Sequence, residues 1–201
     1  MIIGISGKAG CGKSTLARLL MERLPGAWQR IGFADILKRE VAKFYGFDVA
    51  LAFDEKGKGS PVKRPAQLHG DWWPWEHEFV TVRQLLQHYG TDVYRKRDPN
   101  YWVERMREHL ATVIPLSYGV IIDDVRFINE AAMVRDMGGL LVRLEPYLEW
   151  KPGAGAEHAS ETNLDGWTDW DVKVNPMFGE LDWVADMVHA QVLDAEEGKA
   201  A

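Results

Sequence analysis

The feature that most constrains the fold is a segment near the start of the chain, Gly7-Lys8-Ala9-Gly10-Cys11-Gly12-Lys13-Ser14. It fits the pattern G-x-x-x-x-G-K-[ST] without a mismatch. A short apolar, β-branched run, Met1 to Ser6, precedes the segment and predicts a buried strand. Leucines at helical spacing follow it from Lys13 to Leu24, and Pro25-Gly26 ends this helix. A strand, a glycine-rich turn and a helix in this order predict a phosphate-binding loop, or P-loop.

The residue types in this loop have chemical reasons. Glycines let backbone N–H groups turn inward around phosphate oxygens, and the helix start adds a positive dipole end. We expect Lys13 to reach the β- and γ-phosphates of a nucleoside triphosphate, the Ser14 hydroxyl to bind Mg²⁺, and Thr15 to lie near the α-phosphate. Cys11 is interpreted as a small filler. The predicted triphosphate site therefore comprises Gly7, Lys8, Ala9, Gly10, Cys11, Gly12, Lys13, Ser14 and Thr15.

The rest of the chain alternates predicted strands with predicted helices. Further strands are expected at Gln29–Phe33, Val120–Ile122, Leu140–Leu144 and Val172–Asn175. Helices are expected at Asp35–Tyr45, from Thr81, at Tyr101–Leu110, Asn129–Met137 and Glu180–Leu193, before a frayed polar tail from Asp194. This alternation predicts an α/β, three-layer P-loop NTPase fold, with a parallel sheet of about five strands and helices on both faces.

Composition narrows the functional classes. The 201 residues are enough for one sizeable core, and the net charge of -6 argues against stable binding to nucleic acid. A single cysteine excludes an internal disulfide and fits a reducing cytosol. The chain begins with no basic leader and contains no apolar run long enough to span a bilayer, so we expect a cytoplasmic protein without membrane contact.

Acidic and basic residues follow the predicted strand ends, where ligands bind in parallel sheets. Asp123 and Asp124 end the strand Val120–Ile122 and are candidate Mg²⁺ ligands together with Ser14; surface acids at a strand end are the alternative. Arg126, two residues on, suits contact with a phosphate group.

Further basic residues are expected beside the ligand-binding cleft at these strand ends. They favour an anionic molecule as the acceptor of a transferred phosphoryl group; the alternative is a set of solvated surface charges. They are Lys38, Arg39, Arg83, Arg95 and Arg97. Gln87, with Tyr89 and Trp102, could recognise a base, although the two aromatic residues could equally belong to the core. His158-Ala159-Ser160-Glu161 follows a glycine-bearing loop and predicts either a lid that excludes water or a simple helix cap.

In their order and spacing, several segments resemble the deoxynucleoside monophosphate kinases of tailed bacteriophages. They are Gly7 to Thr15, Phe33-Ala34-Asp35 with Leu37-Lys38, Arg83 with Leu86-Gln87, Gly90-Thr91-Asp92, Pro99 to Val103, Asp124 to Phe127 with Asn129-Glu130, and His158 to Glu161. The resemblance implies an adenylate-kinase-like fold and ATP with Mg²⁺ as the donor. It also implies a deoxynucleoside 5′-monophosphate (dNMP) as acceptor, a role in precursor supply for phage DNA in the host cytoplasm, and a homodimer among the expected states.

On this basis Lys13, Arg126 and Asp124 are the expected catalytic residues. The expected substrate-binding residues are Asp35, Lys38, Arg83, Gln87, Arg95, Trp102, Asp124, Arg126, Glu130 and His158. The expected organisation is a single kinase domain, residues 1–201, with a monophosphate-binding or insertion region at about residues 46–110 and a small lid at about residues 146–163.

Two features depart from this family's pattern. An arginine is expected directly after the strand Leu140–Leu144, but Glu145-Pro146 stands there with Arg143 before it, so Lys151 or His158 would have to replace its charge. The Trp-rich stretch from Asp71 to Trp75 has no counterpart and either shapes base selectivity or covers the core.

Other functions remain open from the sequence. The closest is a P-loop kinase of another small acceptor, such as dephospho-coenzyme A or phosphomevalonate. A kinase acting on modified nucleotides in DNA is a second, and a nucleotide-dependent regulatory binding module is a rival from a different class.

Overall fold

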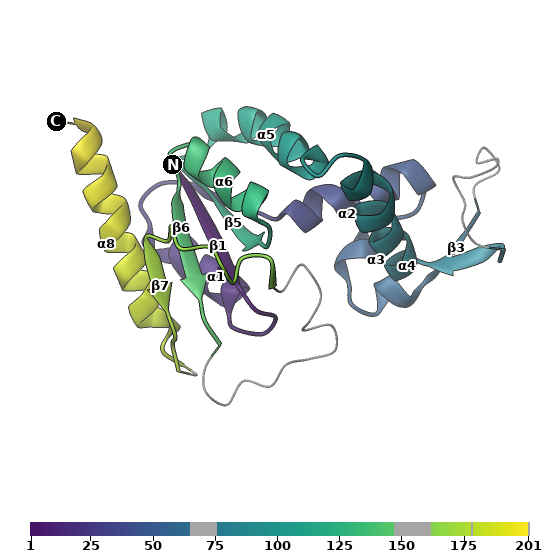
Figure 1. Ribbon diagram of the computed structural model, residues 1–201, viewed down its shortest axis with the longest axis horizontal. Helices are drawn as coiled ribbons and strands as arrows, with labels where there is room; N and C mark the ends of the chain where they lie inside the picture. Colours follow the sequence, from purple (N-terminus) through teal and green to yellow (C-terminus); the bar gives the residue numbers. More distant parts are fainter. Residues whose placement is uncertain (65–75, 147–161, 178, 201) are drawn as a thin grey trace. The chain divides into compact units, whose positions relative to one another are not determined.

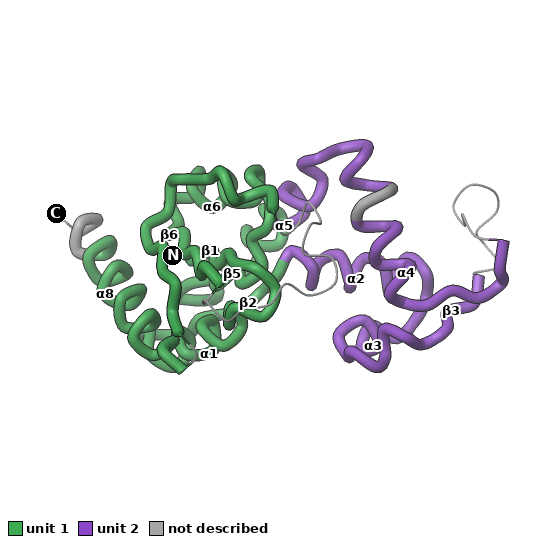
Figure 2. The backbone as a smooth tube through the Cα atoms, turned by 60° about the horizontal axis from the view of Figure 1, so that its bottom comes forward, with its two compact units in different colours: residues 1–32, 107–201 green, residues 33–106 purple. Residues whose placement is uncertain are grey.

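The computed structural model describes residues 1–64, 76–146, 162–177 and 179–200. The chain forms two compact units: unit 1 comprises Met1–Gly32 and Arg107–Ala201, and unit 2 comprises Phe33–Met106 (Figure 2). Unit 2 overlaps the insertion region expected at about residues 46–110, but it begins earlier, at Phe33. The expected lid falls largely on residues 147–161, which lie outside the described residues.

Unit 1 is built on a five-stranded sheet with the strand order β2-β5-β1-β6-β7. Strands β5, β1, β6 and β7 of this sheet are labelled in Figure 1. All neighbouring pairs are parallel. The strands are β1 (Ile2–Gly7), β2 (Trp28–Ile31), β5 (Gly119–Val125), β6 (Leu140–Leu144) and β7 (Val172–Val174). Because the chain must cross from one end of the sheet to the other before each parallel strand, the connections are long, and those from β1 to β2, β2 to β5 and β5 to β6 carry helices. The predicted parallel sheet is confirmed.

Helices cover both faces of this sheet. Ile3 and Ile5 of β1 pack in one buried cluster with helix α1 (Lys13–Arg23) and helix α8 (Leu181–Ala200). Gly4 alternates with them and faces the other side, where a Cβ would lie 3.1 Å from Val134 of helix α6 (Ile128–Asp136). Each fully buried aliphatic side chain in these layers stabilises the fold by about 1.5–3 kcal/mol. The three-layer α/β architecture is therefore confirmed.

Several predicted element boundaries differ from those in the structure by two or more residues, and two of them are instructive. The second strand ends at Ile31, and Phe33 instead begins helix α2 (Phe33–Tyr45), where its side chain is buried. The last helix does not end at Leu193 but continues to Ala200, because the residues after Asp194 are mostly Ala, Glu and Lys, which favour helix. Within the described residues, no helix is both long and apolar enough to cross a membrane.

Unit 2 is mostly helical. Its elements are α2, α3 (Ala50–Phe53), the single turn η1 (Gly57–Gly59), α4 (Val82–Gln87), the π-helical segment η3 (His88–Arg95) and an antiparallel pair, β3 (Pro61–Lys63) with β4 (Phe79–Thr81). Strand β3 lies in the stretch from Phe53 to Gly70, which is rich in Gly, Lys and Pro and would be expected from composition to form a loop. Helix α5 (Tyr101–Val113) starts in unit 2 and continues into unit 1, where the turn η4 (Ile114–Leu116) follows.

Aromatic rings form much of the interior of unit 2. Tyr45, Tyr89 and Trp102 are buried, and the Tyr89 ring lies 4.5 Å from that of Tyr94 and 6.3 Å from that of Trp102, measured between centroids. Thr81 caps α4 by accepting a hydrogen bond from the Gln84 backbone, while the Gln84 side chain accepts one from the Thr81 N–H. This capping box explains why the helix begins where the sequence predicted.

Candidate triphosphate site at the end of the parallel sheet

The predicted phosphate loop connects β1 to α1 at the carboxyl end of the central strand. Gly12 is the residue before the first helical turn and has the left-handed backbone angles φ 91° and ψ 13°. A Cβ on Gly12 would lie only 2.7 Å from Cδ1 of Leu181, at the start of α8. Both the backbone conformation and the close approach of Leu181 therefore require glycine at this position.

The lysine of the motif is folded back over the loop. Lys13 is buried, and its Nζ donates hydrogen bonds to the carbonyl oxygens of Gly7 and Lys8, each at 2.7 Å. Ser14 and Thr15 beside it are exposed at the start of α1, where the N–H groups of a first turn lack acceptors within the helix. The ammonium group, two hydroxyls and a helix start thus lie together, an arrangement suited to a polyphosphate.

Cys11 stabilises the loop from within. Its Sγ lies 2.8 Å from the Lys8 carbonyl oxygen and 3.6 Å from that of Leu144, and the side chain is buried. The thiol is a weak donor to these oxygens and fills space between the loop and β6. These contacts support the interpretation of Cys11 as a small filler.

The two acids of β5 occupy an irregularity in the sheet. Gly4 pairs with Ile122 but Ser6 pairs with Val125, so β5 contains one extra residue where Asp123 and Asp124 stand. A bulge of this kind re-aims the side chains beside it. Asp124 is half-buried and packs against Gly32: a Cβ added to Gly32 would lie only 2.6 Å from Oδ2 of Asp124. The adjacent acids therefore need not point to opposite faces of the sheet.

Asp123 is buried and forms an ion pair with the exposed Arg30, which the sequence did not predict. Its side chain is 1% exposed, and its Oδ2 accepts a hydrogen bond from Nε of Arg30 at 2.9 Å. Its other oxygen, Oδ1, is buried and has no hydrogen-bond partner in the described part of the chain. In the sequence, Arg30 could be noticed only as a charged residue on a predicted strand. Its pairing with Asp123 follows from the strand register, which aligns Arg30 with Ile121 of β5.

Arg126 lies in the turn between β5 and α6. Glu130 holds this turn: its Oε2 accepts hydrogen bonds from the N–H groups of Arg126 (2.8 Å) and Phe127 (3.1 Å), and its side chain is buried. Glu130 thus has a local structural role at the start of α6, and its expected contact with substrate stays a prediction.

The remaining candidates lie in unit 2. Asp35 is buried and pairs with Lys38 at 3.1 Å, and the Lys38 ammonium lies 4.4 Å from the centre of the Phe53 ring. Trp102 is buried, and its indole N–H donates to the Gly90 carbonyl at 3.1 Å. Gln87 is exposed and Arg95 is half-buried.

Arg83 forms an exposed ion pair with Glu55. Hydrogen bonds from Lys58 and Arg83 lower the pKa of Glu55 to about 2. Of the other sequence-based candidates, His158 and Lys151, like the tryptophans at 72, 73 and 75, fall outside the described residues. The structure therefore groups the donor-side candidates around α1 and β5, while the assignments of Asp35, Lys38, Arg83, Gln87, Arg95 and Trp102 to an acceptor stay predictions.

A phosphate loop between the first strand and first helix of a parallel sheet defines the P-loop nucleotide-binding class. The sequence model of the deoxynucleotide monophosphate kinase family matches residues 51–152. The chain belongs to this family and is therefore a nucleotide kinase. It is 28% identical over 184 residues, 86% of each chain, to a protein of Acanthamoeba polyphaga mimivirus named "Putative deoxynucleotide monophosphate kinase".

Among solved structures, shikimate kinases are similar at a distance. The chain is 17% identical to that of Aquifex aeolicus, with a TM-score of 0.41, covering 100% of this chain and 98% of the other. It is 14% identical to that of Bacteroides thetaiotaomicron, with a TM-score of 0.41 and 98% coverage of both chains. At these values the similarity carries no information on the substrate.

Proposed function

We propose that the chain transfers the γ-phosphoryl group of ATP to a deoxynucleoside 5′-monophosphate. An oxygen of the acceptor phosphate attacks the γ-phosphorus, the bond to the β–γ bridging oxygen breaks, and ADP and the deoxynucleoside diphosphate result. The observation that carries the proposal is the buried Lys13 in a phosphate loop at the carboxyl end of a parallel sheet, in a chain of this kinase family. The product suits the expected supply of precursors for phage DNA.

Lys13 supplies the central charge. Its ammonium already lies beside the loop backbone, 2.7 Å from two carbonyl oxygens, so a small rotation about its side chain exchanges these acceptors for the β- and γ-phosphate oxygens. A buried cation interacts more strongly with developing negative charge than an exposed one, because less water screens it. The first turn of α1, with Ser14 and Thr15, completes the donor side.

The residues present fit a magnesium ion. The exposed Ser14 hydroxyl is a ligand of the type Mg²⁺ prefers, and the buried Asp123 Oδ1, which has no hydrogen-bond partner in the described residues, is a carboxylate oxygen available to the ion or to its water. Asp124 is the alternative carboxylate. Within the described chain there is no group of three or more His, Cys, Asp or Glu that could hold a metal. When bound, the ion neutralises phosphate charge.

The acceptor phosphate is assigned to cationic side chains. We propose that Arg126 contacts it, because Glu130 holds the Arg126 backbone at the end of β5. Lys38, Arg83 and Arg95 are proposed to add charge, and Asp35, Gln87, Trp102 and His158 to contact the nucleoside or the phosphate. The acceptor phosphate is an anion near neutral pH, so the transfer needs positioning more than a strong general base.

The decisive experiment compares Lys13→Ala with Lys43→Ala, an exposed lysine of α2, in a coupled assay of ADP release. Lys13→Ala should fold and lose at least about 100-fold in turnover, and Lys43→Ala should match the wild type. Acceptors are each common dNMP, a modified dCMP or dUMP, dephospho-coenzyme A and phosphomevalonate. Near-normal turnover by Lys13→Ala would refute the mechanism, and ADP release only with a non-nucleotide acceptor would refute the substrate.

A further inference from the structure

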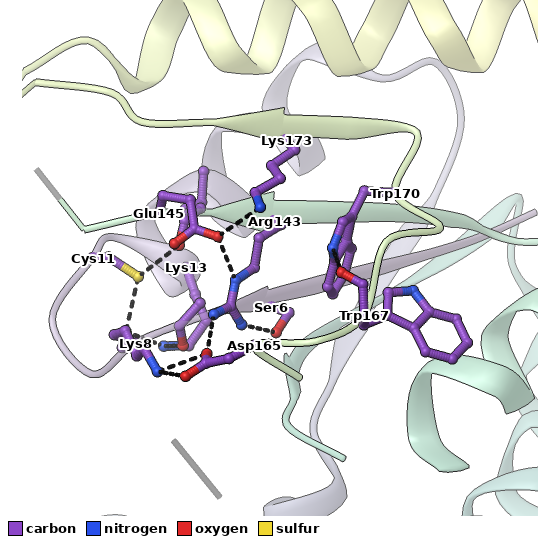
Figure 3. Close-up of polar contacts among 12 residues, drawn as sticks. Ser6, Lys8, Cys11, Lys13, Arg143, Glu145, Asp165, Trp167, Trp170 and Lys173 are labelled. Atoms are coloured by element: carbon purple, nitrogen blue, oxygen red, sulfur yellow. Dashed lines mark hydrogen bonds and ion pairs between the residues drawn. The ribbon is translucent and has the colours of Figure 1, made fainter. Parts of the chain in front are cut away.

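A buried arginine at the carboxyl end of β6 is not used by the mechanism above. Arg143 is 4% exposed and donates three hydrogen bonds from its guanidinium group (Figure 3). Nη1 contacts Oγ of Ser6 at 3.1 Å, Nη2 contacts Oδ1 of Asp165 at 3.0 Å, and Nε contacts Oε1 of Glu145 at 3.3 Å. The guanidinium carbon also lies 5.8 Å from the centre of the Trp170 ring. A buried charge is tolerated only with such compensation.

Asp165 connects this arginine to the phosphate loop. Its two carboxylate oxygens lie 2.8 and 2.9 Å from Nζ of Lys8, the second residue of the motif (Figure 3). The carbonyl of Lys8 in turn accepts a hydrogen bond from Lys13 at 2.7 Å. A continuous set of contacts therefore runs from Arg143 through Asp165 and Lys8 to the lysine assigned to the triphosphate.

The same arginine also holds the residue before the loop. Ser6 and Arg143 are paired neighbours in the parallel ladder of β1 and β6, so the arginine reaches Ser6 across adjacent strands. Ser6 immediately precedes Gly7, the first residue of the motif. Arg143 and Asp165 thus anchor the side chains on both sides of Gly7, that of Ser6 through one contact and that of Lys8 through the other.

The burial of the side chains determines how strongly each of these contacts holds the loop. The Lys8–Asp165 pair is partly exposed, with side-chain exposures of 15% and 49%, and such a pair alone contributes little. Arg143 is different, because its planar fork is fixed by three acceptors and shielded from water. The carboxylate of Asp165 is therefore held in place by a rigid partner, which raises its capacity to hold Lys8.

We propose that Arg143 and Asp165 are positioning residues for the donor nucleotide: they hold Ser6 to Lys8 so that the phosphate loop is organised before a nucleotide binds. The proposal rests on the proposed function, since it takes the loop to be the donor site. A loop ordered in advance loses less conformational freedom on binding, so nucleotide affinity is higher. In this role Arg143 holds the phosphate loop. It does not replace the arginine that was expected directly after β6.

The test measures the affinity for Mg²⁺-ADP by isothermal titration calorimetry with Arg143→Met, Arg143→Lys, Asp165→Asn and their combinations. Arg143→Met should raise the Kd about tenfold. Arg143→Lys should recover part of the loss, because one ammonium can reach Asp165 or Ser6 but lacks the planar fork that bonds both. Arg143→Met combined with Asp165→Asn should cost no more than Arg143→Met alone. In turnover, KM for ATP should rise while KM for the dNMP stays constant.

Arg135→Met is the matched control. Arg135 of α6 is a partly buried arginine in unit 1, paired with Asp169 at 2.9 Å and Asp171 at 2.7 Å, and Asp171 accepts a hydrogen bond from the N–H of Leu141 in β6. Its removal should lower stability but leave the Kd for Mg²⁺-ADP unchanged.

The outcomes separate the two proposals. If the wild type binds no nucleotide, the proposed function fails and this inference fails with it. If the wild type binds and Arg143→Met and Asp165→Asn bind equally well, the inference alone is overturned. An equal loss in Arg135→Met, or additive losses in the double variant, also overturns it. If Arg143→Met does not fold, the Kd of Asp165→Asn for Mg²⁺-ADP decides whether the inference holds, because this substitution changes one atom of a half-exposed side chain.

Discussion

Replacing Gly12 by alanine tests the geometry of the phosphate loop most directly. The substitution places a residue with a Cβ at φ 91°, which costs about 1–2 kcal/mol for a residue other than glycine. The new methyl group would also lie 2.7 Å from Cδ1 of Leu181, so α8 or its side chain must shift, at about 1–3 kcal/mol. Because Leu181 is partly buried against the unit 1 core, we expect only partial relief and a total loss of about 2–4 kcal/mol.

Gly138→Ala provides the matched control. Gly138 follows α6 and has a similar left-handed angle, φ 68°, but nothing lies within 4 Å of a Cβ added there. It should lose only the conformational term, about 1–2 kcal/mol. For a domain of this size each kcal/mol lowers Tm by about 2–4 °C, so Gly12→Ala should melt well below Gly138→Ala in differential scanning calorimetry.

Nucleotide binding completes this test. Gly12→Ala should weaken Mg²⁺-ADP at least about tenfold, because the altered turn displaces Lys13 and the start of α1. Gly138→Ala should bind as the wild type does. Leu181→Ala removes the atoms that the new methyl group would contact. Gly12→Ala should therefore cost less stability in a Leu181→Ala background than in the wild-type background. Equal stability of the two glycine variants, with wild-type affinity in Gly12→Ala, would refute the reasoning.

Two further predictions concern unit 2. Burial, with the nearby Tyr94 phenol, raises the pKa of Tyr45 from its ordinary value of 10.0 to about 12. The neutral phenol therefore contributes stability that is fully present below pH 10 and is lost as the pH rises toward 12; urea unfolding at pH 9 and 11.5 should show this loss in the wild type and a smaller one in Tyr45→Phe. Trp102→Phe should cost about 2–3 kcal/mol, because it leaves the Gly90 carbonyl without its indole donor and opens a cavity, whereas Trp183→Phe, on the exposed side of α8, should cost less than 1 kcal/mol; chemical denaturation checks both.

The local elements followed from local sequence. An apolar run before the glycine-rich segment and leucines after it sufficed to predict β1, the phosphate loop and α1, because these depend on neighbours within a few residues. The strand at Leu140–Leu144 was predicted with the bounds it has. The end of β2 was not, since strand pairing decides where the strand stops, and α8 is longer than predicted because its last residues favour helix.

The long-range pairs were beyond the sequence. Arg30 and Asp123 are 93 residues apart, and Arg143 and Asp165 are 22 apart. The strand order and the extra residue in β5 bring the first pair together. In the sequence, Arg143 was noticed only because it lies just before the position where an arginine was expected. Its contact with Ser6 depends on the pairing of β6 with β1.

The sequence by itself determined that this chain has a phosphate loop on a parallel α/β sheet, because eight consecutive residues and their flanking periodicity carry that information. Only the tertiary structure decided which charges surround the loop. It buried Arg143 beside Ser6 and paired Arg30 with one of two adjacent acids. The physical reason is that a charged side chain takes its role from its partners and its burial, and both are set by strands distant in the sequence.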